Sequence, residues 1–385
     1  MTAPIKPKLK QTRLSPILKW AGGKEQELKH IHPMLPRKIK NYYEPFVGGG
    51  AVYFSLEAKK MFINDRSSEL INLYRAIEQG DKDFFSVVDE IIHNWKLLET
   101  IVESNAAIFI NRYQNFSSNR VTETDVENWI FSFLLKHSEE FNGMFETSFN
   151  VNIENFLKEI KKNLISKMKR MKKIEKQRGL LHEKDIVDNF ESAFKSAFYM
   201  HFRHLYNNIE RYKIRHSFGV AIFFFIRNYA YSGMFRYNKK GDFNVPYGGI
   251  GYNRKNLAKK MHYLRSNALV KHLKQTKIEN MDFEKFFLEN RPKKDDFIFL
   301  DPPYDSEFST YSQNSFDRED QKRLANFLLE SCEANWMMVI KNTDFIYSLY
   351  DKEGISIQSF DKKYLVSFQN RNDKNAEHLI ITNYR

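Results

Sequence analysis

Four consecutive residues, Asp301-Pro302-Pro303-Tyr304, combine a carboxylate, two prolines and an aromatic ring. They follow the short apolar run Phe297–Leu300, so we expect them at the end of a buried strand. The prolines stiffen the backbone and remove two N–H donors, which leaves carbonyl oxygens as acceptors. Acceptors beside an aromatic side chain suit a planar ligand with an exocyclic amine. The acceptors would hold the amine while Tyr304 stacks on the ring of the ligand. A simple turn that closes a strand is the alternative.

A glycine-rich segment lies near the N-terminus, in the run Glu44-Pro45-Phe46-Val47-Gly48-Gly49-Gly50. Glycines after a strand let the backbone approach a ligand closely, and Asp65, after the next apolar segment, can accept hydrogen bonds from both ribose hydroxyls of a nucleoside cofactor. NAD-type and S-adenosylmethionine-type cofactors both fit, and a plain glycine turn is the alternative. Tyr53 stands where the dinucleotide fingerprint has Gly or Ala, which disfavours a dehydrogenase.

A third segment, Lys19-Trp20-Ala21-Gly22-Gly23-Lys24, places an aromatic ring and two cations around a flexible turn. Alone it is compatible with a surface loop. Together with the glycine segment, Asp65 and Asp-Pro-Pro-Tyr, it makes a much more specific pattern.

The two ends of the chain have the alternation of strands and helices that is typical of an α/β sheet, and we expect a Rossmann-like fold with a largely helical insertion. Strands are predicted at residues 42–46, 61–63, 277–283, 297–300, 337–340, 364–368 and 378–382, and helices at 51–60 and 320–333.

The middle of the chain is long, helical in pattern and poor in Gly and Pro. We therefore divide the chain into a catalytic domain (1–80 and 270–385), a helical insertion (81–215) and a target-recognition region (216–269). Within the insertion, residues 156–178 predict an amphipathic helix with many Lys and Arg on its polar face. That face either lies along a phosphate backbone or is simply solvated.

The composition favours a polyanionic partner. The net charge of this 385-residue chain is +13 and 15% of its residues are aromatic, which suits phosphates and stacked bases. The composition of an AT-rich genome is the alternative explanation. No apolar run reaches the length of a membrane span, and the basic N-terminus lacks the apolar core of a secretory signal. With Cys332 as its only cysteine, the chain is expected in a reducing cytoplasm, without a metal site.

Taken together, these segments resemble the DNA adenine methylase (Dam) family of N6-adenine methyltransferases. The matching blocks are residues 19–24, 44–50, 63–74, 227–248 and 301–304, and they occur in that family's order. The resemblance covers both ends of the chain and residues 227–283. It does not extend through residues 81–215.

The resemblance implies S-adenosyl-L-methionine as the cofactor and assigns residues to it. Trp20, Lys24, Asp65 and Asp301 match cofactor-contacting positions. The family's cofactor loop corresponds to Phe46, Gly48 and Gly50, and Asp282 resembles the acidic residue that holds the adenine amine of the cofactor.

The block 227–248 resembles the hairpin with which the family reads DNA. Arg236 offers a donor for a guanine edge and Tyr231 a stacking ring. Ser232 stands where several relatives have Asn, so the family's GATC target does not carry over. The expected DNA-binding residues are Lys19, Tyr231, Ser232, Arg236, Asn238, Lys239 and Lys240.

These expectations describe a methyl transfer to N6 of a flipped adenine in duplex DNA. Asp301, Pro302, Pro303 and Tyr304 form the expected catalytic motif, in which Asp301 and the Pro302 carbonyl accept the two N6 hydrogens. An RNA adenine or cytosine N4 is the alternative acceptor, and a non-catalytic nucleic-acid-binding module or a nicotinamide oxidoreductase are more distant readings. A bacterial or viral enzyme of DNA protection, with a cognate restriction endonuclease as partner, fits the pattern.

Overall fold

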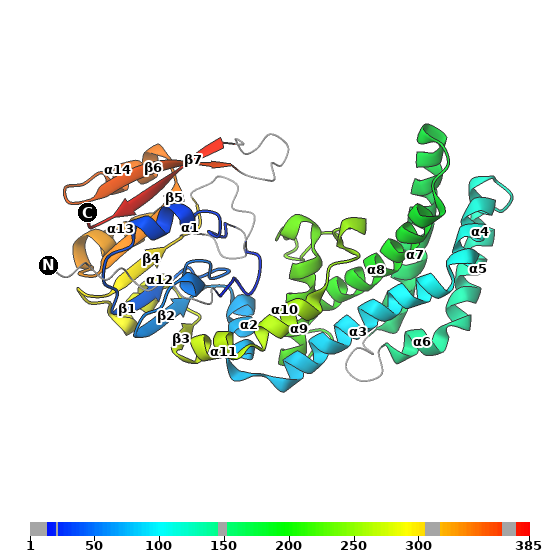
Figure 1. Cartoon of the computed structure of the whole chain (residues 1–385), viewed down its shortest axis with the longest axis horizontal. Coiled ribbons are helices and arrows are strands. Elements are labelled where there is room, and N and C mark those ends of the chain that lie inside the picture. Colours follow the sequence, from blue (N-terminus) through cyan, green and yellow to red (C-terminus); the bar gives the residue numbers. More distant parts are fainter. Residues whose placement is uncertain (1–13, 21, 145–151, 305–315, 364–374) are drawn as a thin grey trace. The chain divides into compact units, whose positions relative to one another are not determined.

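The computed structural model describes residues 14–20, 22–144, 152–304, 316–363 and 375–385. The chain divides into two compact units (Figure 1). The first consists of the described parts of residues 1–80, 235–237 and 263–385, and the second of those of 81–234 and 238–262.

The first unit is built on a seven-stranded sheet with the order β3-β2-β1-β4-β5-β7-β6. All neighbouring strands are parallel except that β7 runs antiparallel to both β5 and β6. All four residues of β4 are buried, as expected for a parallel strand covered on both faces. The strands are β1 (Asn41–Glu44), β2 (Lys60–Asn64), β3 (Thr276–Glu279), β4 (Phe297–Leu300), β5 (Asn335–Lys341), β6 (Ser356–Lys363) and β7 (Asn375–Thr382).

Capped helices flank this sheet. Ser67, Asp282, Asp317 and Thr343 each accept a backbone N–H at the start of a helix, which satisfies donors that the helix itself leaves unpaired. Side chains of α12, α13 and α14 share one buried cluster with β1, β4, β5 and β7. The helices are α1 (Leu28–Ile31), α2 (Ser68–Gln79), α11 (Asn267–Lys274), α12 (Phe283–Asn290), α13 (Arg318–Asn326) and α14 (Asp344–Tyr350).

The predicted Rossmann-like α/β class is confirmed. The strands expected at residues 42–46, 61–63, 277–283, 297–300 and 337–340 correspond to β1 to β5, although β3 ends at Glu279. The strand expected at 378–382 lies in β7, and the one expected at 364–368 is outside the described residues. The helix expected at 320–333 is α13 followed by the π-helical turn Phe327–Ser331.

The helix predicted at residues 51–60 is wrong. Only a single 3₁₀ turn, Tyr53–Ser55, forms there, and Leu56 after it is extended. Residues 51–56 are all buried, so this segment has no solvent face such as an amphipathic helix requires. The Ser55 hydroxyl donates to the Val52 carbonyl at 2.7 Å, a local bond that competes with helical pairing.

The second unit is predominantly helical, as expected for residues 81–215. Its core is aromatic: the Trp95 ring lies 4.4 Å from Tyr229 and 5.5 Å from Phe225 between centroids. Residues 216–234 and 238–262 belong to this same compact unit. Its helices are α3 (Lys82–Ser104), α4 (Ala106–Ser117), α5 (Glu123–Lys136), α6 (Ser138–Gly143), α7 (Ile153–Arg178), α8 (Glu183–Tyr206) and α9 (His216–Tyr229); α10 (Leu257–Leu264) crosses the boundary between the units.

The expected basic helix is α7, and several lysines of its polar face contact the neighbouring helices α4 and α5. Lys161 and Lys169 pair with Glu127 and Glu123 of α5 at 2.8 and 2.6 Å. Lys172 donates to the Phe116 carbonyl of α4 at 2.7 Å. These lysines therefore attach α7 to its neighbours, while contact of the remaining cations with DNA stays a prediction. No helix in the described part of the chain is long and apolar enough to cross a membrane.

Candidate active site

The carboxyl ends of β1, β2, β3 and β4 lie at one edge of the sheet, because these strands are parallel neighbours. The chain leaves β1 for β2 on one side, while β4 pairs with β1 on the other. Open α/β sheets bind ligands at such a switch point. The segments that end in Asp65, Asp282 and Asp301, together with the loop that begins at Gly48, therefore meet at this edge.

Lys24 joins the N-terminal segment to Asp-Pro-Pro-Tyr. Its ammonium donates to Asp301 Oδ1 at 2.5 Å, to the Tyr304 hydroxyl at 3.0 Å and to the Gly22 carbonyl at 2.8 Å. Lys24 is only 2% exposed, and burial acts to lower its pKa, but the charges of Asp301 and Tyr304 outweigh burial and raise the pKa above its ordinary value. Lys24 thus stays charged and forms a buried ion pair with Asp301.

A second carboxyl group, Glu44 at the end of β1, lies in the same region and is buried. The Tyr42 hydroxyl donates to its Oε2 at 2.6 Å. Burial and the charge of Asp301 raise the pKa of Glu44 well above its ordinary value, although the Tyr42 hydrogen bond acts in the opposite direction. The environment therefore favours the neutral form of Glu44, a feature that sequence reasoning missed.

Asp65 supports the glycine loop. Its two carboxylate oxygens accept the N–H groups of Gly48 and Ser67 at 3.0 and 2.9 Å. Burial raises the pKa of Asp65 to about 6, although these N–H groups act to lower it. Each oxygen keeps capacity for another donor, since a carboxylate oxygen accepts about two hydrogen bonds.

The glycine loop packs so tightly that side chains are excluded. Gly48 has a φ of +49°, and a Cβ there would lie 2.8 Å from Trp20 Cδ1. At Gly50, with a φ of +77°, a Cβ would lie 2.6 Å from the Tyr74 hydroxyl. The structure therefore brings Trp20 against the predicted cofactor loop.

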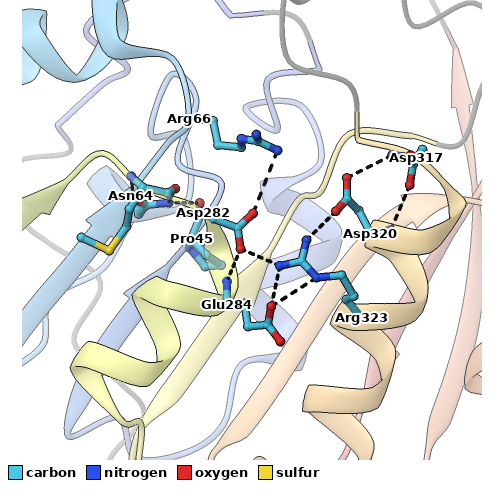
Figure 2. Close-up of polar contacts among 9 residues, drawn as sticks. Pro45, Asn64, Arg66, Asp282, Glu284, Asp317, Asp320 and Arg323 are labelled. Atoms are coloured by element: carbon cyan, nitrogen blue, oxygen red, sulfur yellow. Dashed lines mark hydrogen bonds and ion pairs between the residues drawn. The ribbon is translucent and has the colours of Figure 1, made fainter.

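Asn64, which sequence reasoning missed, fastens this loop to the segment after β3. It is 1% exposed, and its Nδ2 donates to the carbonyls of Pro45 and Met281, both at 3.0 Å. Its Oδ1 accepts the Met281 N–H at 2.9 Å. Figure 2 shows these contacts beside Asp282. A polar residue at the end of a strand is too common a pattern to have indicated this role.

Asp282 is the N-cap of α12, and both of its oxygens face cations. Oδ1 accepts the Glu284 N–H at 3.0 Å and Arg323 Nη2 at 2.8 Å (Figure 2). Oδ2 lies 4.0 Å from Arg66 Nη1. Arg323 comes from α13 and was not predicted, because an arginine on an exposed helix face has no distinguishing pattern.

An aromatic cluster lies next to Asp282. The Phe46 ring is 5.7 Å from Phe283 and 5.4 Å from Phe316, and the latter pair is edge-to-face. The Arg323 guanidinium lies 4.9 Å from the centre of the Phe283 ring. Phe46 was predicted as a cofactor-loop residue, whereas Phe283 and Phe316 were not. Their rings supply an apolar surface on which a base can stack.

The two prolines of the tetrapeptide differ. Pro303 is exposed, and its carbonyl accepts Gln321 Nε2 at 2.9 Å. Pro302 is buried, and its carbonyl has no hydrogen bond from the residues that the structure describes. The Tyr304 ring meets His378 edge-on at 5.4 Å. Of the two prolines, Pro302 is thus the one whose carbonyl can accept from a ligand.

Residues 230–248 form an irregular hairpin. An antiparallel bridge joins Ala230 to Tyr247 at its base. At its tip, Asn238 Oδ1 accepts the N–H groups of Lys240 and Asp242 at 2.8 and 3.0 Å. The Asn238 side chain therefore shapes the turn. The predicted DNA-binding residues are all exposed: Lys19, Tyr231, Ser232, Arg236, Asn238, Lys239 and Lys240.

Helix α8 holds the returning arm of this hairpin. Asn207, just after α8, donates to the Phe243 carbonyl at 3.0 Å and accepts the Phe243 N–H at 2.9 Å. Tyr199 and Arg203 both donate to the Val245 carbonyl, at 3.0 and 3.2 Å. These three residues are spaced by four, so they share one face of the helix. The helical insertion thus supports the hairpin, a role that the sequence did not reveal.

No group of three or more His, Cys, Asp and Glu residues that could hold a metal ion occurs in the ranges that the structure describes.

The model of one protein family, D12 class N6 adenine-specific DNA methyltransferase, matches residues 20–194 and 149–365. These ranges span most of the chain and include the glycine loop, the hairpin and Asp-Pro-Pro-Tyr.

Individual relatives align over nearly the whole chain. The chain is 27% identical to the Type II methyltransferase M.CviBI of a Paramecium bursaria Chlorella virus, over 96% of its own length and 100% of the relative. Identity to the Type II methyltransferase M.MjaIII of Methanocaldococcus jannaschii is also 27%, over 96% and 99%. The DNA adenine methylase of Haemophilus influenzae is 23% identical, over 84% of this chain and 76% of its own length.

Proposed function

The chain belongs to the D12 class of N6 adenine-specific DNA methyltransferases, and from this premise we propose how its residues carry out the reaction. The methyl donor is S-adenosyl-L-methionine, and the acceptor is N6 of an adenine flipped out of duplex DNA. The observation that carries this proposal is the ion pair of Asp301 with the buried Lys24, which also donates to the Tyr304 hydroxyl.

The side chains and glycines at this edge of the sheet suit S-adenosyl-L-methionine. Asp65 would accept from the ribose hydroxyls, as its carboxylate has remaining acceptor capacity. Phe46 would contact the adenine ring and Asp282 its amine. Gly48 and Gly50 leave room for close backbone approach, next to Trp20. S-Adenosyl-L-methionine supplies an electrophilic methyl group on a sulfonium.

The acceptor adenine would be held by the tetrapeptide. Flipping a base costs a few kcal/mol, which stacking on Tyr304 and hydrogen bonds in the pocket offset. The Asp301 carboxylate and the Pro302 carbonyl would accept hydrogen bonds from the N6 amine and so direct the nitrogen lone pair toward the methyl group. As the N–C bond forms, the C–S bond of the donor would break, S-adenosyl-L-homocysteine would leave, and N6 would lose one proton to solvent. As positive charge develops on N6, the Asp301 carboxylate, whose side chain is only 19% exposed, stabilises it more strongly than a carboxylate in water would.

Lys24 has a supporting role in this reaction as well as its expected place near the cofactor. It holds Asp301 Oδ1 through a short hydrogen bond and so fixes the orientation of the carboxylate that would meet the substrate amine. Pro303 acts indirectly, because its carbonyl is engaged by Gln321 and so anchors the tetrapeptide to α13.

The exposed residues of the hairpin 230–248 would recognise the DNA. Arg236 can donate to a guanine edge and Tyr231 can stack or intercalate. Ser232 has a short polar side chain on a backbone with a φ of +53°. Lys239 and Lys240 suit phosphates, together with Lys19.

A role in restriction–modification is proposed from the relatives that are named Type II methyltransferases. In such a system a cognate endonuclease cleaves the unmethylated sequence. The enzyme would then act on DNA in the cytoplasm of a bacterium or of a virus-infected cell.

The reaction can be tested with purified protein and S-adenosyl-L-methionine labelled in the methyl group. Transfer to duplex DNA, single-stranded DNA and RNA is measured, followed by nucleoside analysis. The proposal expects N6-methyladenine in duplex DNA, abolished in Asp301→Ala and retained in Asp351→Ala, an exposed aspartate outside the site. Labelled RNA, labelled cytosine or full activity of Asp301→Ala would contradict it.

A further inference from the structure

Arg323 is the centre of a charge cluster that links α12 to α13 (Figure 2). Its guanidinium donates to Asp282 Oδ1 at 2.8 Å, to Glu284 Oε2 at 2.5 Å and to Asp320 Oδ1 at 2.7 Å. The hydrogen bonds that Arg323 donates to Glu284, and then to Asp282 and Asp320, raise its pKa above the ordinary value. The guanidinium is therefore a fixed cation with three carboxylates around it.

The two oxygens of Asp282 have different surroundings. Oδ1 accepts two donors, the Glu284 N–H and Arg323 Nη2. Oδ2 has Arg66 at 4.0 Å, beyond hydrogen-bond distance, and no closer donor among the residues that the structure describes. Oδ2 is thus the oxygen that can accept a hydrogen bond from a ligand.

Arg323 is itself held in place from several sides. Asp320, its partner on α13, belongs to a capping box in which Asp317 accepts the Asp320 N–H at 3.1 Å and Asp320 accepts the Asp317 N–H at 3.3 Å. The guanidinium also lies over the Phe283 ring. An arginine with both its charge partners and its plane fixed can orient a carboxylate better than a mobile one can.

We propose that Arg323 is the positioning residue for adenine recognition in the methyl donor: by occupying Asp282 Oδ1, it turns Oδ2 toward the 6-amino group. This inference rests on the proposed function, which assigns Asp282 to that amine. Arg323 touches neither donor nor DNA in this scheme and acts through Asp282 alone. Its removal weakens donor binding through loss of the amine hydrogen bond, and the methyl-transfer step itself is not its target.

A purely structural role of Arg323 would change ligand affinities in a different way. If Arg323 only tied α12 to α13, its loss would affect every ligand of the pocket equally. The two roles are separated by a ligand that lacks the amine but keeps the rest of the molecule.

The experiment measures binding of S-adenosyl-L-homocysteine, and of its analogue with hydrogen in place of the 6-amino group, by calorimetry with the full chain. Wild type, Arg323→Ala, Asp282→Asn and the double variant are compared. Lys322→Ala is the matched control, because Lys322 is the neighbouring α13 cation and pairs only with Glu319 in the described structure.

Wild type and Lys322→Ala should prefer the amine-bearing ligand by about tenfold to a hundredfold, as expected for a hydrogen bond to a charged group. Arg323→Ala should reduce this preference to a few-fold while the affinity for the amine-free analogue stays within about twofold. The double variant should lose no more than Asp282→Asn, because the two residues act through one contact. The KM for the donor should rise with little change in kcat.

Equal weakening of both ligands in Arg323→Ala, or an undiminished preference for the amine, would overturn the inference. Failure of the proposed function has another signature: wild type would not bind S-adenosyl-L-homocysteine, or would bind both ligands equally.

Discussion

The buried ion pair between Lys24 and Asp301 gives the most quantitative prediction. Lys24→Met keeps the length and most of the volume of the side chain but removes an ammonium that makes three hydrogen bonds. Breaking a fully buried ion pair costs about 3–5 kcal/mol, because a charge is left without its partner. The Asp301 side chain is 19% exposed, and water offsets part of that cost, so the free energy of unfolding should fall by about 2–3 kcal/mol.

The rate of methyl transfer by the folded protein should fall as well. Without Lys24 the Asp301 carboxylate loses the donor that fixes its orientation, so transfer by folded protein should fall by about a hundredfold. Urea denaturation gives the stability, and transfer of labelled methyl groups to duplex DNA gives the rate. Lys29→Met, which changes an exposed lysine of α1, is the matched control and should resemble wild type. A Lys24→Met variant with wild-type stability and rate would refute this account of the ion pair.

Three further outcomes are expected. The affinity for S-adenosyl-L-homocysteine, measured by calorimetry, should be constant near neutral pH and fall by about tenfold per pH unit below pH 6. The reason is that Asp65, with a pKa of about 6, loses acceptor capacity when it is protonated. An affinity that does not change with pH would be inconsistent with this role of Asp65. Gly80→Ala, at a φ of +64° in open space, should lower the free energy of unfolding by about 1 kcal/mol in urea denaturation. Gly50→Ala should lower it by about 2–4 kcal/mol, because its Cβ also collides with Tyr74. Equal losses for the two variants would contradict the packing argument. Asn207→Ala should weaken binding of target duplex by about tenfold without changing cofactor affinity, and unchanged DNA binding would exclude α8 as the support of the hairpin.

The parts of the fold that the sequence predicted well are those with a local signal. β4 is a continuous apolar run because it is buried on both faces, and its end is marked by Asp301 and two prolines. The glycine loop was equally visible, since positive φ and close packing leave no room for other residues at Gly48 and Gly50.

The parts that escaped prediction depend on contacts between distant segments. Arg323 meets Asp282 across 41 positions, and Asn64 meets Met281 across 217. Neither contact leaves a periodic pattern in the sequence. The segment 51–56 was mistaken for a helix because its complete burial, which removes the solvent face, is a property of the folded sheet.

The lysines of α7 show that the sequence also leaves the partners of charged residues undetermined. The sequence showed a basic face, but only the structure separates Lys161 and Lys169, which pair with α5, from the others. Half-exposed pairs of this kind contribute little to stability, so this arrangement follows from packing rather than dictating it.

The most direct test of the central claim is methylation-sensitive sequencing of plasmid DNA from cells that express this protein, with Asp301→Ala as the control. We predict N6-methyladenine at one recurring sequence motif in the wild-type sample and none above background in the variant. Unmodified DNA from folded, cofactor-binding protein, or equal methylation with Asp301→Ala, would contradict it.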